Sequence, residues 1–218
     1  MLGLRTAQWT GLLGVSGFVI CVVAAHLTRP SLDPASHMIS EYARYGPRAV
    51  ITVGFGLWAI SLVASAVYVA GTWPPTLASR ALSVLMLLAA VGVVALAAFR
   101  TQTSAGELAF GRGVSLEGRL HDVGSGVVSL ALFAGACLVV LSRVLPHWRR
   151  LAGVALLVAA VAVHVAFLSI GPEVGGLRQR LVLLCGLMWQ TLLLSWRGRP
   201  DAAGAAAYDS WRAHPPRR

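Results

Sequence analysis

Residues 81–99 of the chain read ALSVLMLLAAVGVVALAAF, a run without a single charged side chain. An α-helix rises about 1.5 Å per residue, so roughly 20 apolar residues cross the hydrocarbon core of a bilayer. The run is apolar on every side, which a helix on the surface of a soluble domain is not. The stretch therefore predicts a transmembrane helix.

The rest of the chain repeats this pattern. Hydrophobic residues make up 57% of the sequence and charged residues only 12%, too few to cover a soluble domain. Six windows are close to span length, at 9–27, 49–71, 81–99, 122–142, 151–170 and 181–196. We expect an all-α fold, a polytopic membrane helix bundle of six transmembrane helices in one domain at 1–196. An Arg/Ala/Pro-rich tail, 197–218, is expected to be disordered and cytoplasmic.

The first window has a second interpretation. Arg5, the apolar run and the small residues Val23-Ala24-Ala25 also fit a secretory signal peptide. Because the run has nearly span length and only one basic residue before it, we expect a retained helix.

The net charge of +10 comes from arginines, since the chain has no lysine. They lie mainly between the apolar runs and in the tail, which favours anionic lipid headgroups over nucleic acid as partners. With the N-terminus inside, ten arginines fall on the inner side and eight on the outer side. This bias predicts a multi-pass protein of the cell membrane with both termini cytoplasmic. The expected partners are the bilayer and a hydrophobic small molecule, and the sequence does not indicate an oligomeric state.

Six crossings place the loops after the first, third and fifth helices on one face of the membrane. These segments hold most of the acidic residues: Asp33, Glu41, Glu107, Glu117, Asp122 and Glu173. They also hold His37 and His121, while His26 and His164 lie near the same ends of their helices. The convergence marks this face as the place to expect a site.

Within residues 28–46, His37, Ser40, Glu41 and Arg44 are spaced as one face of a helix. Asp33 followed by Pro34 has the pattern of a helix start. One interpretation is an interfacial helix with this polar face in water. The other is that the polar face lines the mouth of a cavity.

A second polar stripe enters the fourth span. Glu117, His121, Ser125 and Ser129 follow one another at steps of four, and Asp122 lies beside them. Asp122 would either pair with Arg100 or Arg119 in a structural role or belong to a working site, because ionisable groups in spans face protein or water.

His164 stands alone in an apolar helix and needs a hydrogen-bond partner there, as a packed residue or as a ligand. His37, His121, His164 and Asp122 would make a zinc set, and His26 with His164 a haem pair. No compact ligand spacing supports either, so we expect no metal and no cofactor. Cys21, Cys137 and Cys185 lie in apolar runs and are expected to pack.

The segment His37-Met-Ile-Ser-Glu-Tyr-Ala before a span, and Phe99 followed by a Gly/Thr/Ser-rich loop and Gly118-Arg-Leu-His121, resemble a bacterial membrane family. It is the family of domain of unknown function 998. The resemblance covers all six helices and matches Ser40, Glu41 and His121. The family has an acidic residue shortly after the Phe, where this chain has Gln102. No activity is implied by the family.

The residues themselves favour a membrane-embedded enzyme with a lipid-like or isoprenoid substrate, such as a cyclase. Glu41 and Asp122 would be the acid/base groups, with His121 orienting them or relaying a proton. The substrate-binding candidates are His37, Ser40, Arg44, Glu117, Ser125 and His164. Aromatic rings at Phe55, Trp58, Phe99 and Trp189 would face a developing cation or simply pack. The alternative is a non-enzyme: a small carrier, a sensor or a partner subunit of another membrane protein.

Overall fold

Six long α-helices form the bundle in the computed structural model, which describes residues 2–46, 48–102, 114–142, 147–168 and 172–196. They are α1 (Leu2–Thr28), α3 (Arg48–Thr72), α4 (Leu77–Ala98), α5 (Leu116–Ser142), α6 (His147–Leu168) and α7 (Gly175–Leu194). Short elements connect them: η1 (Ile39–Glu41), α2 (Tyr42–Tyr45) and η2 (Pro172–Val174). The described residues contain no β-strand.

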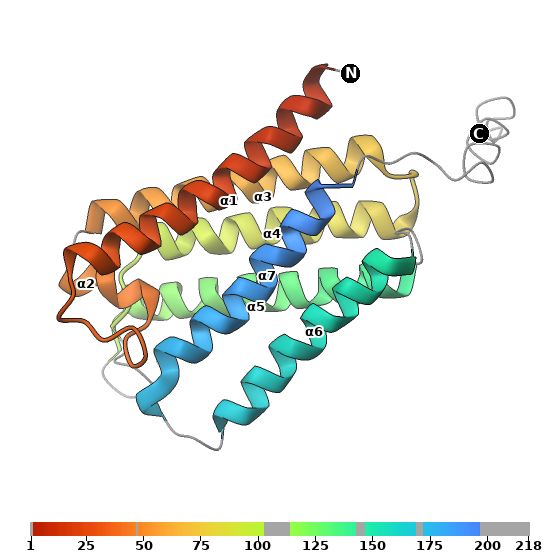
Figure 1. Cartoon of the computed structure of the whole chain (residues 1–218). Helices are drawn as coiled ribbons and strands as arrows, with labels where there is room; N and C mark the ends of the chain where they lie inside the picture. The colour runs from red at the N-terminus through yellow and green to blue at the C-terminus, as the bar shows by residue number, and fades with distance from the viewer. Residues whose placement is uncertain (1, 47, 103–113, 143–146, 169–171, 197–218) are drawn as a thin grey trace, which may run out of the picture.

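The predicted all-α bundle is confirmed, and each predicted window overlaps one of the six long helices. Among the described residues, five helices are long and apolar enough to cross a membrane. The sixth, α7, has 20 residues, with Arg178 and Arg180 in its first turns, and runs between α1 and α6 in Figure 1. The predicted tail lies outside the described residues, as does Glu107.

Most helices begin several residues before the apolar windows. In α4 a polar cap accounts for this earlier start. In α4 the side chain of Thr76 accepts a hydrogen bond from the backbone N–H of Ser79, and the Ser79 side chain accepts one in return from Thr76 N–H. This capping box starts the helix at Leu77, ahead of the apolar run.

Glycines bring neighbouring helices into close contact. A Cβ on Gly14 of α1 would lie 2.6 Å from the carbonyl oxygen of Leu57 in α3, and one on Gly92 of α4 would lie 2.7 Å from that of Gly124 in α5. Such approach of backbones is how helices associate in a bilayer. It pairs α1 with α3 and α4 with α5.

A polar network connects α7 to α3 and α1 within the core. Gln190 is fully buried, and its side-chain nitrogen donates to the hydroxyls of Ser61 at 2.8 Å and Ser65 at 2.9 Å. Its oxygen accepts from the indole of Trp58 at 3.2 Å. Ser61 in turn donates to the carbonyl of Gly11 at 2.6 Å. Every polar atom of the Gln190 side chain is thus bonded.

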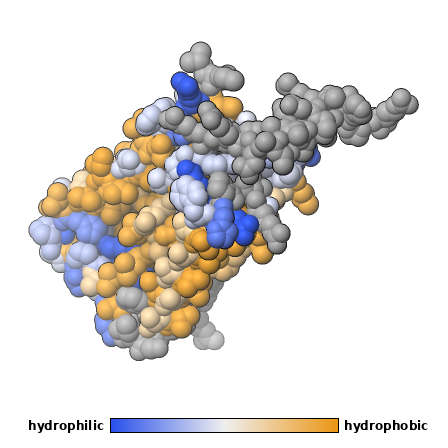
Figure 2. All heavy atoms as spheres, turned by 45° about the vertical axis from the view of Figure 1, so that its right-hand side comes forward, coloured by the Kyte–Doolittle hydropathy of each residue, from blue (hydrophilic) through white to orange (hydrophobic). Residues whose placement is uncertain are grey.

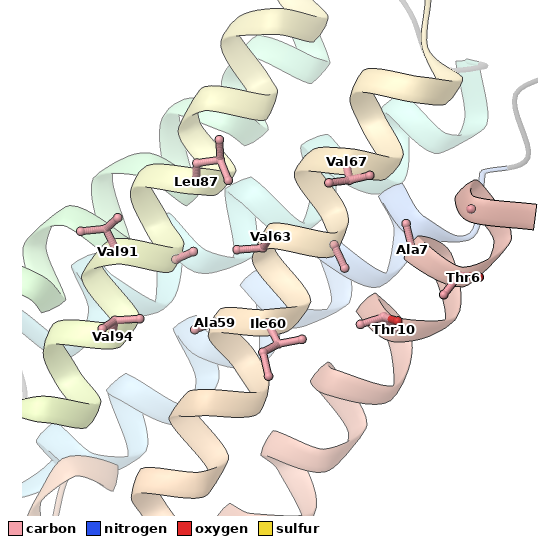
Figure 3. A pocket seen from close by; sticks show the side chains of 13 residues that line it. Thr6, Ala7, Thr10, Ala59, Ile60, Val63, Val67, Leu87, Val91 and Val94 are labelled. Atoms are coloured by element: carbon pink, nitrogen blue, oxygen red, sulfur yellow. The ribbon is translucent and has the colours of Figure 1, made fainter.

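The outer surface of the helices is apolar, as a lipid-facing surface must be. Hydrophobic residues cover much of the face in Figure 2, and large side chains such as Leu13, Ile20, Val91 and Leu130 are exposed. An open groove of about 710 Å³ lies between α1, α3 and α4, lined by small and apolar side chains such as Ala7, Ile60 and Val91 (Figure 3). Its described lining includes no titratable group, so we exclude it as a reaction site.

Candidate functional site

The three loops predicted to share a face do lie together. Backbone N–H groups of Gly176 and Leu177 donate to the carbonyls of Ser36 at 3.2 Å and Ala35 at 2.8 Å. The side chain of Gln179 accepts from the N–H of Ile39 at 2.7 Å. On the other side, Arg44 donates to the carbonyl of Gln102 at 3.1 Å. The convergence is confirmed for the described parts of these loops.

The segment before α3 is not one continuous helix, so the prediction of a single helical face there is wrong. The carboxylate of Asp33 closes a turn, accepting from the N–H of Ala35 at 3.0 Å and from the Ser36 hydroxyl at 3.2 Å. These bonds hold the pKa of Asp33 below its usual value. Met38 is extended, which directs the N–H of Ile39 to Gln179 rather than along a helix.

The extended residue changes which groups are buried. Ser40 and Glu41 are buried, whereas Arg44 is exposed. The interfacial-helix interpretation, with the whole polar face in water, therefore does not hold. The cavity interpretation holds for Ser40, which lines a cavity.

That cavity has a volume of about 560 Å³ and lies among α5, α6 and α7, with α3 and residues 38–40 closing it. Its polar lining includes Ser40, His121, Asp122, Ser125, His164 and Arg178. Its apolar lining includes Phe55, Trp58, Leu132, Phe133, Leu183 and Trp189. Five of the predicted site residues thus share one cavity. Glu41, His37, Arg44 and Glu117 are not among its lining residues.

His121 is buried and held in one tautomer. Its Nδ1 lies 2.9 Å from the carbonyl oxygen of Phe99, which can only accept, so Nδ1 carries the hydrogen. In the neutral imidazole Nε2 is then the acceptor. A backbone carbonyl that orients the ring in this way is the usual support of a histidine that exchanges protons.

Asp122, next to His121, has an unsatisfied oxygen. Its Oδ2 is buried without a hydrogen-bond partner among the described residues. A structural ion pair with Arg100 or Arg119 is therefore not formed through this oxygen. Burying a carboxylate oxygen without a partner costs free energy. Oδ2 of Asp122 is therefore a candidate to bind a proton or a ligand.

Glu41 is 2% exposed and lies outside the cavity lining, beside Ser40. Its Oε1 also has no partner among the described residues. Burial raises the pKa of this carboxyl, outweighing the attraction of His37 and two arginines. The structure thus separates the two predicted acid/base carboxylates: Asp122 lines the cavity and Glu41 does not.

The three other candidates make contacts within or between the loops, outside the cavity lining. Arg44 bonds Gln102, and Glu117 accepts from the backbone N–H of Arg100 at 2.9 Å. His37 contacts the carbonyl of Asp33 through Nδ1 at 3.2 Å. Gln102 accepts from the N–H of Ser115, just before α5, at 2.9 Å. A carboxylate at this position would supply the same acceptor.

Two arginines at the start of α7 were not among the predicted site residues. Arg180 donates to His26 at 2.9 Å and to the carbonyl of His37 at 2.7 Å, and it lies over the ring of Tyr42. His26 is half-buried and bonded to this arginine. Arg178 lines the cavity. Both could have been identified from the sequence, because they are charged residues at the start of an otherwise apolar helix.

His164 is exposed on α6 and lines the cavity, and it makes no hydrogen bond to the described residues. The partner expected for it is thus not found among them. Across the described part of the chain, no three His, Cys, Asp or Glu side chains are grouped so as to hold a metal ion.

Comparison with known proteins gives a family without a function. No curated protein and no solved structure matches the chain. The model of the family described as "Protein of unknown function (DUF998)" matches residues 12–196, from within α1 to two residues past the end of α7. This chain belongs to the DUF998 family.

Proposed function

We propose that the protein is a membrane-embedded enzyme that performs acid–base chemistry on a lipid-like or isoprenoid substrate in the α5–α6–α7 cavity. One observation carries the proposal: His121, with its tautomer fixed by Phe99, and Asp122, with an oxygen that lacks a partner, line the same largely apolar cavity. Buried, partly unsatisfied titratable groups in a cavity are characteristic of reaction sites.

The cavity offers a route for a substrate from the bilayer. Leu130 and Phe133 of α5 and Val161 and Val165 of α6 line it and are also exposed on the outside of the protein. A hydrophobic molecule would enter between these two helices without crossing water. This route favours a substrate that resides in the membrane.

The residues suit a proton-initiated rearrangement. Asp122 would donate a proton to a carbon–carbon double bond or an epoxide, leaving a cation on the substrate. The faces of Trp58 and Trp189 in the cavity wall would stabilise that cation. His121 would then remove a proton through Nε2, so the substrate is isomerised with no net change in protons. Glu41, outside the lining, would position Ser40 rather than touch the substrate.

Two variants test this role. Asp122→Asn and His121→Gln keep size and hydrogen-bonding capacity but cannot exchange protons as the native groups do. Both are expected to fail to complement a deletion strain while their melting temperatures in detergent stay near that of the wild type. The matched control is Glu117→Gln in the same helix, which keeps an acceptor for Arg100 and does not line the cavity.

The outcomes separate the candidate functions. Normal complementation by both Asp122→Asn and His121→Gln would remove the acid–base role and favour the carrier, sensor or partner-subunit alternative. Loss of complementation together with a large fall in melting temperature would favour a structural role, because stranding a buried charge costs about 3–5 kcal/mol.

We also propose that both termini are cytoplasmic. The arginine distribution supports this orientation. The side chain of Gln8 donates to the carbonyl of Leu194 at 2.6 Å, so the start of α1 and the end of α7 lie at the same end of the bundle. A reporter that is active only outside the cytoplasm, fused after Arg218, should give no signal, and a strong signal would reverse the orientation.

A further inference from the structure

The charged residues and histidines of the cavity lining gather at one end of the cavity. Asp122 lies six residues from the start of α5, Arg178 three residues from the start of α7 and His164 four residues from the end of α6. At about 1.5 Å per residue, all three lie within roughly 9 Å of the ends of their helices. They are at the loop end of the cavity.

The other part of the cavity is largely apolar, although Ser125 and Ser129 of α5 also line it. Along α5 the lining continues from Asp122 to Ala136, about 21 Å of helix. Over this length the walls include Trp58, Phe133 and Trp189. A molecule that fills the cavity therefore has a polar end at the loops and one extended apolar chain toward the middle of the bilayer.

Arg178 determines the charge of the polar end. It is the only lysine or arginine among the described lining residues, and its guanidinium makes no hydrogen bond or ion pair with any described residue. Arg180, two residues later, bonds to His26, His37 and Gly176. Arg180 thus supports the loops. The five N–H donors of Arg178 have no described partner, so they can bind a ligand.

We infer that the cavity binds a single-chain amphiphile with an anionic head, a phosphate or carboxylate, which Arg178 pairs with at the loop end. This inference rests on the proposed function, since it names the class of substrate for the same site. Arginine matches such heads because its planar fork forms two parallel hydrogen bonds with their oxygens.

The other titratable lining residues at this end allow an anion to bind. His164 can present an N–H to it and has no described partner that competes, whereas Nε2 of His121 is an acceptor in the neutral ring and stays available for the proposed proton transfer. Asp122 is the only carboxyl among the described lining residues. In its proposed role it carries a proton, so it would not repel the head.

Binding can be measured without knowing the natural substrate. The full chain in phosphatidylcholine nanodiscs would be titrated with dodecyl phosphate brominated in its chain, and quenching of tryptophan fluorescence would be followed. Of the seven tryptophans, Trp58 and Trp189 line the cavity and would be quenched by bound probe. We expect saturable quenching, which the brominated alcohol of the same chain length does not reproduce at the same concentrations. Inorganic phosphate should not displace the probe, because it has no chain to fill the apolar part.

Arg178→Gln should weaken binding of the phosphate probe about tenfold or more, since charge-assisted hydrogen bonds are lost. Arg178→Lys should restore part of the affinity because the charge remains. Arg119→Gln, an exposed arginine of α5 outside the cavity lining, is the matched control and should bind as the wild type does. Melting temperatures would confirm that each variant is folded.

Three results would overturn the inference: wild-type affinity in Arg178→Gln, equal binding of the brominated alcohol, or displacement of the probe by inorganic phosphate, which would indicate a site for a free anion. Asp122→Asn distinguishes the two proposals. It should bind the probe like the wild type even though it fails in complementation, so failure of the chemistry would not be mistaken for failure of binding.

Discussion

Arg180 of α7 and His26 of α1 form a direct side-chain link, with Nε and Nη2 of the arginine 3.1 and 2.9 Å from Nε2 of the histidine. Nδ1 of the same ring lies 2.6 Å from the carbonyl of Val22, so Nε2 is the acceptor. The ring also stacks on Tyr42, at 4.6 Å between centroids. The link thus connects two helices distant in sequence to the segment that closes the cavity.

His26→Phe tests this link, because phenylalanine keeps the stack on Tyr42 and removes the acceptor. Arg180 retains its bonds to His37 and Gly176, so we expect a loss of about 1–2 kcal/mol in the free energy of unfolding. Hydrogen exchange of residues 33–46 should quicken more than exchange in α4. Unchanged exchange in this segment would mean that the other contacts hold it without His26.

The raised pKa of Glu41 predicts how the stability of the protein depends on pH. Its pKa is raised in the folded protein by burial, so folding favours the protonated form. The contribution of Glu41 is therefore fully present below its ordinary pKa of 4.5 and is lost as pH rises through the raised value. In Glu41→Gln this loss should disappear, so the variant should gain in melting temperature relative to the wild type between about pH 4.5 and 7.5.

Asp33→Asn is the matched control for that experiment, because the carboxyl lies in the same loop but its pKa is lowered and it is fully exposed. Its difference from the wild type should run the other way: the wild type gains stability as pH rises through the lowered pKa of Asp33 toward the ordinary value of 3.8, and above that value the difference should stay constant. A Glu41→Gln variant that is less stable than the wild type at pH 7.5 would indicate a charged carboxylate that makes a stabilising contact.

Loss of the hydrogen bonds of Gln190 is expected to lower stability without impairing function. Gln190→Leu removes two hydrogen bonds to serines and leaves the buried indole N–H of Trp58 without its acceptor. Interhelical hydrogen bonds in membranes contribute about 0.6 kcal/mol on average and up to about 1.7. We expect a loss of about 1–2 kcal/mol in detergent, with complementation retained.

Thr191→Val at the neighbouring position is the control. The hydroxyl of Thr191 donates only to the carbonyl of Leu187 within its own helix, and the residue is exposed. This variant should melt within about 0.5 kcal/mol of the wild type. Equal stability of Gln190→Leu and Thr191→Val would show that the network contributes little.

The helices were predictable because their signal is local. Each run of apolar residues must cross the bilayer as a helix, whatever lies next to it, since an unsatisfied backbone is too costly there. The shared face of the three loops followed from the number of crossings alone. His121 and Asp122 were identified because ionisable groups are rare in spans.

The parts that were missed depend on contacts between distant residues. Gln190 is the only amide in an apolar run. The residues near it in sequence do not indicate that its partners are Trp58, Ser61 and Ser65. The spacing of His37 and Glu41 favoured a continuous helix, but the bond between Ile39 and Gln179, 140 residues apart, extends the chain at Met38. Periodicity cannot reveal such a tertiary bond, so it could not predict that Glu41 is buried.

A substitution at Gly176 tests most directly how the segment before α3 packs on the start of α7. A Cβ at this position would contact the carbonyl oxygen of His37 and lie 2.7 Å from that of Pro34, and both are backbone atoms that cannot rotate away. Gly176→Ala should therefore push the start of α7 from residues 34–37 and weaken the bonds from Gly176 and Leu177 to the loop. We expect a cost of about 1–3 kcal/mol.

The same substitution should also displace Arg178 from the cavity end, so binding of the brominated dodecyl phosphate should weaken even in the variant that remains folded. Gly126→Ala in α5 is the matched control, because a Cβ there meets nothing within 4 Å. Alanine is the better helix former by about 1 kcal/mol, so this control should be neutral or more stable than the wild type. The contrary outcome is that Gly176→Ala has the same melting temperature and probe affinity as Gly126→Ala. Residues 34–37 could then separate from α7 without loss of stability or binding. This result would contradict the role of residues 38–40 in closing the cavity.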